Sequence, residues 1–233
     1  MLKSKMNLYL TYLLLGIFLS CQNNKALNQS ATVDQDRMTY QLDKYTRAND
    51  LESYEQAFFA GGCFWCTEAA FERIEGVADV ISGYSGGDEQ YPEYYAVGRG
   101  ETSHCEAICI YYNKDLVDYE TLLEVFFIAH DPTTLNRQGP DVGEEYRSAI
   151  YYNTDTELEA ISRKILEVNE SGMYNDPVVT EVAPYKEFWV AEDYHQNYYE
   201  LHPNDRYVHN VSRPKVEKVK KTFPELLKEK YRK

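Results

Sequence analysis

Two cysteines in the run Gly61-Gly62-Cys63-Phe64-Trp65-Cys66 are the residues of this chain best suited to nucleophilic chemistry. The apolar residues 57–60 predict a buried strand and residues 64–73 predict a helix, so the two glycines make the turn between them. Cys63 then lies at the start of the helix, where unpaired N–H groups and the macrodipole favour a thiolate. We therefore expect an exposed, nucleophilic Cys63 with a lowered pKa beside a pocket formed by the two aromatic residues.

Cys66 follows Cys63 by three residues and shares a face of the predicted helix with it, within reach of a disulfide. This spacing favours Cys66 as the thiol that resolves a sulfenic acid on Cys63. Cys105 is the second choice for the resolving thiol, and Cys109 lies on the same face of the predicted sheet as Cys105. The plainer interpretation is that these cysteines are small buried hydrophobic residues.

Glu106 is the candidate general acid. It lies in a predicted strand at 104–112, where two of the residues that share its face are Ile108 and Ile110. Partial desolvation among apolar neighbours would raise the carboxyl pKa, so that Glu106 keeps its proton at neutral pH. Without further information, an edge carboxylate paired with an arginine or lysine is the commoner case.

Three further polar residues lie in the predicted loops 82–103 and 131–145 or directly after them. Tyr94 and Tyr146 carry phenol hydroxyls that can donate a hydrogen bond at neutral pH, although 22 tyrosines make any single one a weak candidate. Asp141, within Gly-Pro-Asp-Val-Gly, is by type a turn residue. Loops of this length in a small domain are usually functional.

Several separated motifs resemble class A peptide methionine sulfoxide reductases, over about residues 58–227. They are Gly-Cys-Phe-Trp-Cys at 62–66, Ser-Gly-Tyr-Ser-Gly-Gly at 82–87, His-x-Glu at 104–106, His-Asp-Pro-Thr-Thr-Leu-Asn-Arg-Gln-Gly at 130–139 and Asp-Tyr-His-Gln-Asn-Tyr-Tyr at 193–199. The resemblance implies reduction of the S epimer of methionine sulfoxide, in oxidised proteins or free, with a thioredoxin-like reductant and no metal or organic cofactor.

The resemblance also assigns roles to individual residues. Cys63 attacks the sulfoxide sulfur while Glu106 delivers a proton. Tyr94 and Tyr146 bind the sulfoxide oxygen, and Asp141 organises the polar network near the thiol. The substrate methyl group lies against Phe64 and Trp65. His195 is expected to be a hydrogen-bonded scaffold residue.

The chain departs from the family pattern in three places. Ser103 and Cys105 flank His104 where glycine and alanine are usual, and Glu144-Glu145 replaces a usual Thr-Gln before the second candidate tyrosine. No cysteine follows Cys109, so the second recycling cysteine of many members is absent. The added carboxylates would affect peptide preference or the pH profile.

Residues 1–20 have the pattern of a signal peptide, with Lys3 and Lys5 before a short apolar run. The run ends at Leu-Ser-Cys, which resembles a bacterial lipoprotein cleavage site and predicts lipidation of Cys21. Residues 21–53 are polar and predict a flexible spacer. An ordinary cleaved signal is the alternative. We expect export to the bacterial cell envelope with a lipid anchor.

The remaining pattern predicts an α+β fold, namely a two-layer sandwich with a ferredoxin-like split βαβ core and long loops. The expected strands are 57–60, 77–81, 104–112, 147–152, 178–182 and 188–190, and the expected helices are 64–73, 119–130 and 156–171. We expect a reductase domain at 54–212 and a basic, solvated helical tail at 213–233. The formal net charge of −14 argues against nucleic-acid binding, and we expect a monomer.

Two other functions compete. A thioredoxin-like dithiol oxidoreductase would use Cys63 and Cys66 on protein disulfides, although bulky Phe-Trp between the cysteines disfavours it. A non-catalytic zinc module would use Cys63, Cys66, Cys105 and Cys109, although the long spacing between the two pairs disfavours that.

Overall fold

A computed structural model describes residues 53–232 of the chain. The predicted signal peptide, Cys21 and nearly all of the predicted spacer lie outside the described residues. No helix within 53–232 is long and apolar enough to span a bilayer.

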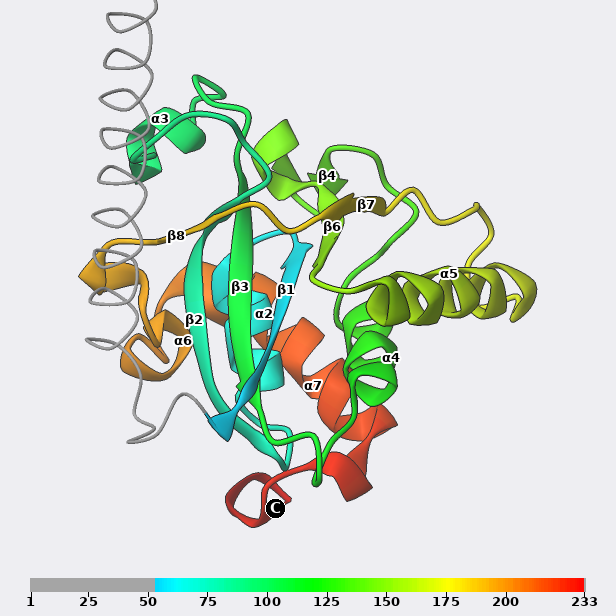
Figure 1. The fold of residues 1–233 in the computed structure, drawn as a ribbon. Helices are drawn as coiled ribbons and strands as arrows, with labels where there is room; N and C mark the ends of the chain where they lie inside the picture. The colour runs from blue at the N-terminus through cyan, green and yellow to red at the C-terminus, as the bar shows by residue number, and fades with distance from the viewer. Residues whose placement is uncertain (1–52, 233) are drawn as a thin grey trace, which may run out of the picture. The chain divides into compact units, whose positions relative to one another are not determined.

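The centre of the fold is a split βαβ arrangement (Figure 1). Its elements follow one another as β1 (Glu55–Gly61), α2 (Phe64–Phe71), β2 (Val77–Ser85), β3 (Cys105–Tyr112), α4 (Tyr119–Ala129) and β6 (Ser148–Tyr152). The strands lie in the order β6-β1-β3-β2 and all pair antiparallel. This is the ferredoxin-like order, and the predicted α+β class is confirmed.

Two short strands complete the sheet. β7 (Glu181–Pro184) pairs parallel with β6, and β8 (Phe188–Val190) pairs antiparallel with β2. The chain between them crosses the sheet face opposite α2 (Figure 1), where Tyr185 stacks on Phe58 at 4.0 Å between ring centroids. Both faces of the central strands are therefore covered, which explains why every residue of β3 is buried.

Two longer helices begin where side chains cap them. Asp118 accepts the Thr121 N–H at 2.8 Å before α4, and Thr154 accepts the Glu157 N–H at 3.2 Å before α5 (Asp155–Glu170). Each cap satisfies an N–H group that the first helical turn leaves unpaired. These helices match the predicted ones to within one residue at each end.

The predicted loops contain more regular structure than the sequence suggested. Residues 82–85 continue β2, and α3 (Tyr94–Val97) follows. The second loop contains the hairpin of β4 (Arg137–Gln138) and β5 (Asp141–Val142), then the 3₁₀ turn η2 (Glu144–Tyr146). β7 begins three residues later than predicted. Polar and glycine-rich composition concealed these short elements, because their pairing partners are distant in sequence.

The basic C-terminal segment is not a solvated tail, so that expectation was wrong. Helix α7 (Arg213–Thr222) packs against α2 and α4, and buries Val216 and Val219. Beyond it, Leu227 is 2% exposed and forms a β-bridge with Ile74. The lysines dominated the composition, whereas the apolar residues at helical spacing decide the packing.

Replacing Leu227 with alanine tests whether this segment belongs to the core. We expect Leu227→Ala to lower the free energy of unfolding by about 2–4 kcal/mol, because a buried leucine leaves a cavity. Leu201, which is 67% exposed, provides the control; Leu201→Ala should change stability by less than about 0.5 kcal/mol. Urea unfolding measures both, and equal small effects would mean that the segment is peripheral.

Candidate active site

The turn between β1 and α2 requires glycine at position 62. Gly62 has a φ of +81°, and a Cβ atom there would lie 2.5 Å from Gln138. Gln138 is fixed in turn, because its side chain bonds the Asp131 N–H at 3.1 Å and the Asp131 carbonyl at 2.9 Å. The close approach of this loop places Cys63 at the N-cap of α2.

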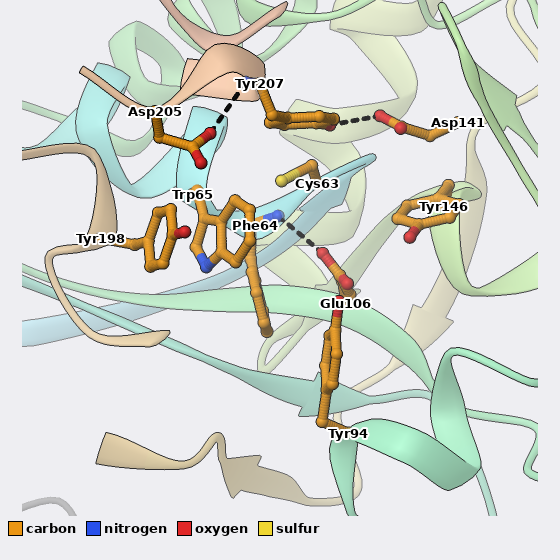
Figure 2. Close-up of a pocket in the computed structure, with 10 residues that line it drawn as sticks. All are labelled: Cys63, Phe64, Trp65, Tyr94, Glu106, Asp141, Tyr146, Tyr198, Asp205 and Tyr207. Carbon is orange, nitrogen blue, oxygen red and sulfur yellow. Dashed lines mark hydrogen bonds between the residues drawn. The ribbon is translucent and has the colours of Figure 1, made fainter. Parts of the chain in front are cut away.

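A cavity of about 280 Å³ opens beside this turn (Figure 2). It is lined by Cys63, Phe64, Trp65, Tyr94, Glu106, Asp141, Tyr146, Tyr198, Asp205 and Tyr207. The structure thus brings together seven of the residues singled out from the sequence, although they come from α2, α3, β3, β5 and η2. Cys66, three residues further along in α2, does not line the cavity.

The two cysteine thiols share a hydrogen bond. The bond from Cys63 lowers the pKa of Cys66 to about 7, opposed by burial and assisted by the charge of Lys215. Ser212 adds a hydroxyl contact at 3.2 Å from the Cys66 sulfur. Burial raises the pKa of Cys63 well above its ordinary value, and the neighbouring Cys66 and Glu106 raise it further. Of the two thiols, Cys66 is therefore the one that ionises more readily.

The expectation of an exposed Cys63 with a lowered pKa does not hold in this resting state. The side chain is 5% exposed, although it lines the cavity. A helix N-terminus stabilises a charge by about 0.3–2 kcal/mol, roughly one pKa unit. Full burial shifts a pKa by up to about 3–5 units in the opposite direction. Burial therefore outweighs the helix end.

Glu106 has the raised pKa that its strand position suggested. The residue is 3% exposed, and its carboxyl group accepts the Phe64 N–H at 2.9 Å (Figure 2). Burial raises the pKa of Glu106 to about 8 against the effect of that hydrogen bond, and the acidic Cys66, Asp141 and Glu145 raise it further. Glu106 is therefore protonated at neutral pH and can donate a proton into the cavity.

The two candidate tyrosines also keep their protons. Burial raises the pKa of Tyr94 to about 12, with a further contribution from Glu106. The pKa of Tyr146 is raised for the same two reasons. Both phenols line the cavity with Glu106, so the site offers three O–H groups to an oxygen atom bound there.

Three residues that line the cavity were not predicted from the sequence, namely Tyr198, Asp205 and Tyr207. Tyr207 donates its hydroxyl proton to Asp141 at 2.5 Å, and the same oxygen is within hydrogen-bond reach of the Cys63 sulfur. Asp205 accepts the backbone N–H of Tyr207 at 2.8 Å and so fixes the turn. Tyr198 forms part of the wall. The Asp-x-Tyr-Val sequence at 205–208 is a cap signal, and it could have located this turn.

The aromatic wall is held from behind by His195. The indole of Trp65 stacks on Tyr198 at 3.8 Å between ring centroids, and its N–H donates to His195 Nδ1 at 3.2 Å. Burial lowers the pKa of His195 to about 4, so the ring is neutral and can accept this bond. His195 therefore positions Trp65, in keeping with the expected scaffold role.

Glu144 and Glu145 differ in position. Glu144 is exposed, whereas Glu145 is buried and is among the charges that raise the pKa of Glu106. The departure from the family pattern at 145 therefore favours the protonated form of the acid.

The other two cysteines do not join the site. The Cys105 sulfur lies 3.1 Å from the Tyr151 hydroxyl, and Cys109 pairs with Phe58 across the strands, on the face opposite Glu106. No group of three or more histidine, cysteine or acidic side chains within 53–232 is arranged to hold a metal ion, so the four cysteines form no zinc module.

Comparison with known proteins places these residues in one family. The family model for peptide methionine sulfoxide reductase matches residues 55–227. The chain is 48% identical over 169 residues to peptide methionine sulfoxide reductase MsrA of Natronomonas pharaonis, covering 72% of this chain and 95% of that protein. It is 49% identical over 173 residues to MsrA of Haloquadratum walsbyi, covering 74% and 98%.

A solved structure agrees with the sequence comparisons. Reduced Mxr1 from Saccharomyces cerevisiae superposes with a TM-score of 0.61 at 32% identity, covering 66% of this chain and 88% of that one.

The raised pKa of Glu106 makes stability depend on pH. The folded protein holds the Glu106 proton up to about pH 8, whereas the unfolded chain releases it near 4.5, so stability falls as the pH rises between these values. We expect Glu106→Gln to reduce this slope by about 1 kcal/mol per pH unit. Urea unfolding from pH 5.5 to 7.5 measures the slope.

Buried Glu68, whose pKa is also raised to about 8 by burial, remains in the variant and retains its own share of the slope. Identical slopes in both proteins would show that Glu106 ionises normally.

Proposed function

Because the chain belongs to the peptide methionine sulfoxide reductase family, we propose that Cys63 is the nucleophile of that activity, Glu106 its acid and Cys66 its resolving thiol. The chain is an oxidoreductase that reduces methionine sulfoxide in peptides to methionine. These roles are proposed because one cavity is lined by the Cys63 thiol, the protonated Glu106 carboxyl group and the aromatic rings of Phe64 and Trp65.

The first step transfers oxygen from the substrate to Cys63. The sulfoxide methyl group packs on Phe64 and Trp65, which directs the sulfur toward the thiol. Tyr94 and Tyr146 donate hydrogen bonds to the sulfoxide oxygen. The proton shared by the two cysteines moves to Cys66, which leaves Cys63 as the attacking thiolate.

Proton transfer from Glu106 makes the oxygen a hydroxyl group as the sulfur is attacked. The attack bonds the Cys63 sulfur to the substrate sulfur. The hydroxyl group then passes to Cys63 as this S–S bond and the substrate S–O bond break, so methionine leaves and Cys63 is a sulfenic acid. Asp141 and Tyr207 hold the polar side of the cavity beside the sulfur.

The second step forms a disulfide. Cys66 attacks the sulfenic sulfur of Cys63, an S–S bond forms and water leaves. Support for this step comes from the mutual effect of the two cysteines on their pKa values, which requires neighbouring sulfurs. A thioredoxin-like dithiol then reduces the disulfide by exchange and is itself oxidised.

Stoichiometric turnover separates the roles of the two cysteines. We expect Cys63→Ser to release no methionine from the S epimer, because the nucleophile is absent. Cys66→Ser should release about one methionine per enzyme and then stop when thioredoxin is the only reductant. Chromatography of the product after single and multiple turnovers measures both, and the R epimer should not react.

Cys109→Ser provides the matched control, because Cys109 is buried away from the cavity. It should retain full turnover. Full recycling of Cys66→Ser by thioredoxin would exclude Cys66 as the resolving thiol.

We also propose that the protein is exported and anchored to a bacterial membrane through a lipid on Cys21. The support is the charged, apolar and small-residue pattern of residues 1–21. Several acyl chains on one cysteine would anchor the domain firmly, whereas one chain binds marginally. The polar residues 22–53 would then separate the reductase from the membrane.

Substitution of Cys21 tests the anchor. In a bacterial host expressing the full chain, we expect the protein to enter the detergent-rich phase and to incorporate labelled fatty acid. Cys21→Ser should move it to the aqueous phase, whereas Asn23→Ser should have no effect. Unlabelled, aqueous wild-type protein would favour an ordinary cleaved signal.

A further inference from the structure

Lys215, at the start of α7, carries a charge in an unusual environment. Its Nζ atom is buried and has no hydrogen-bond partner within residues 53–232. A buried ammonium group is costly unless an opposite charge compensates it. The feature therefore calls for an anion that is present in the working protein.

The position of Lys215 identifies that anion. Ser212, three residues earlier and on the same helical face, contacts the Cys66 sulfur at 3.2 Å. Helix α7 packs directly against α2, which carries Cys66, and the charge of Lys215 acts on that thiol. Of the other charged groups that act on Cys66, Asp141 opposes its ionisation and Cys63 is its hydrogen-bond donor.

The second neighbour of Lys215 is not an anion. The charge of Lys215 also acts on His130, whose ring nitrogens contact the Phe126 carbonyl at 2.8 Å and the Ser148 hydroxyl at 2.7 Å. Burial lowers the pKa of His130 to about 4, so the ring is neutral and both its nitrogens are occupied. Of these two groups, only Cys66 can carry a negative charge.

We propose that Lys215, together with Ser212, is a positioning residue that holds Cys66 as a thiolate for the resolving step. The inference rests on the proposed role of Cys66. In that step Cys66 gives up the proton that it received from Cys63, and its thiolate attacks the sulfenic sulfur of Cys63. The S–S bond forms, the S–O bond breaks, and the departing hydroxide takes that proton and leaves as water.

Lys215 and Ser212 also assist the exchange that reduces the Cys63–Cys66 disulfide. Because Cys63 lines the cavity and Cys66 does not, an incoming dithiol attacks the Cys63 sulfur. Cys66 is then the leaving group, and a thiol with a lower pKa leaves faster. Lys215 therefore serves both formation and reduction of the disulfide.

Loss of the charge has opposite effects at low and high pH. Lys215→Met should raise the pKa of Cys66 by about one unit, which lowers the thiolate fraction but makes each thiolate about threefold more nucleophilic. Disulfide formation should then be about threefold slower at pH 5.5 and about two- to threefold faster at pH 9. A structural defect would slow the reaction at both pH values.

Rapid quenching measures this step alone. Reduced enzyme is mixed with one equivalent of sulfoxide and quenched over time, and mass spectrometry then separates sulfenic acid, trapped by dimedone, from disulfide. Methionine yield in the same samples counts folded, active enzyme. Lys215→Arg should retain the wild-type profile, and Lys221→Met, on an exposed site of the same helix, should change neither step.

The outcomes distinguish the two levels of the proposal. A wild-type enzyme that forms no Cys63–Cys66 disulfide would remove the proposed role of Cys66. A wild-type disulfide with an unchanged pH profile in Lys215→Met would overturn the role of Lys215 alone. If Lys215→Met yields no methionine, Ser212→Ala supplies the test, and a pH profile identical to wild type would again overturn the inference.

Discussion

The hydrogen bond from the Phe64 N–H to Glu106 joins the two parts of the active site. It connects the first turn of α2 to β3, deep in the sheet, so the proposed nucleophile and the proposed acid share one rigid frame. The same burial that leaves Glu106 without water keeps its proton in place at neutral pH. The position of Glu106 relative to Cys63 and the raised pKa of Glu106 therefore follow from one packing arrangement. A change in one of them would change the other.

This arrangement explains why the C-terminal segment is part of the domain. Helix α2 is buried on nearly all sides, so a second layer must cover the face that the sheet does not. Residues 198–227 supply that layer, and they also bring Tyr207 and Ser212 to the two cysteines. The basic composition of the segment concealed its role, since Lys218, Lys221 and Lys230 are exposed while Val216 and Val219 are buried in a helix that packs against α2 and α4.

The sequence was informative where the determinants are local. Apolar patterns located β1, α4 and α5, and the motif around Cys63 located the turn. Strand parity placed Glu106 on the correct face of β3. Long-range effects were not predictable: Tyr207 meets Asp141 only through the fold, and the pKa of Cys63 depends on burial that its spacing does not reveal.

The chemistry depends on two environments that differ across a few ångströms of α2. Acidic groups and burial act on Glu106 and hold its proton, whereas a hydrogen bond and the charge of Lys215 act on Cys66 and remove one. Moving the cation to the Glu106 side would favour the ionised form of Glu106 and the neutral form of Cys66. Glu106 can therefore stay protonated at a pH at which Cys66 ionises, because Lys215 lies behind α2 and away from the cavity.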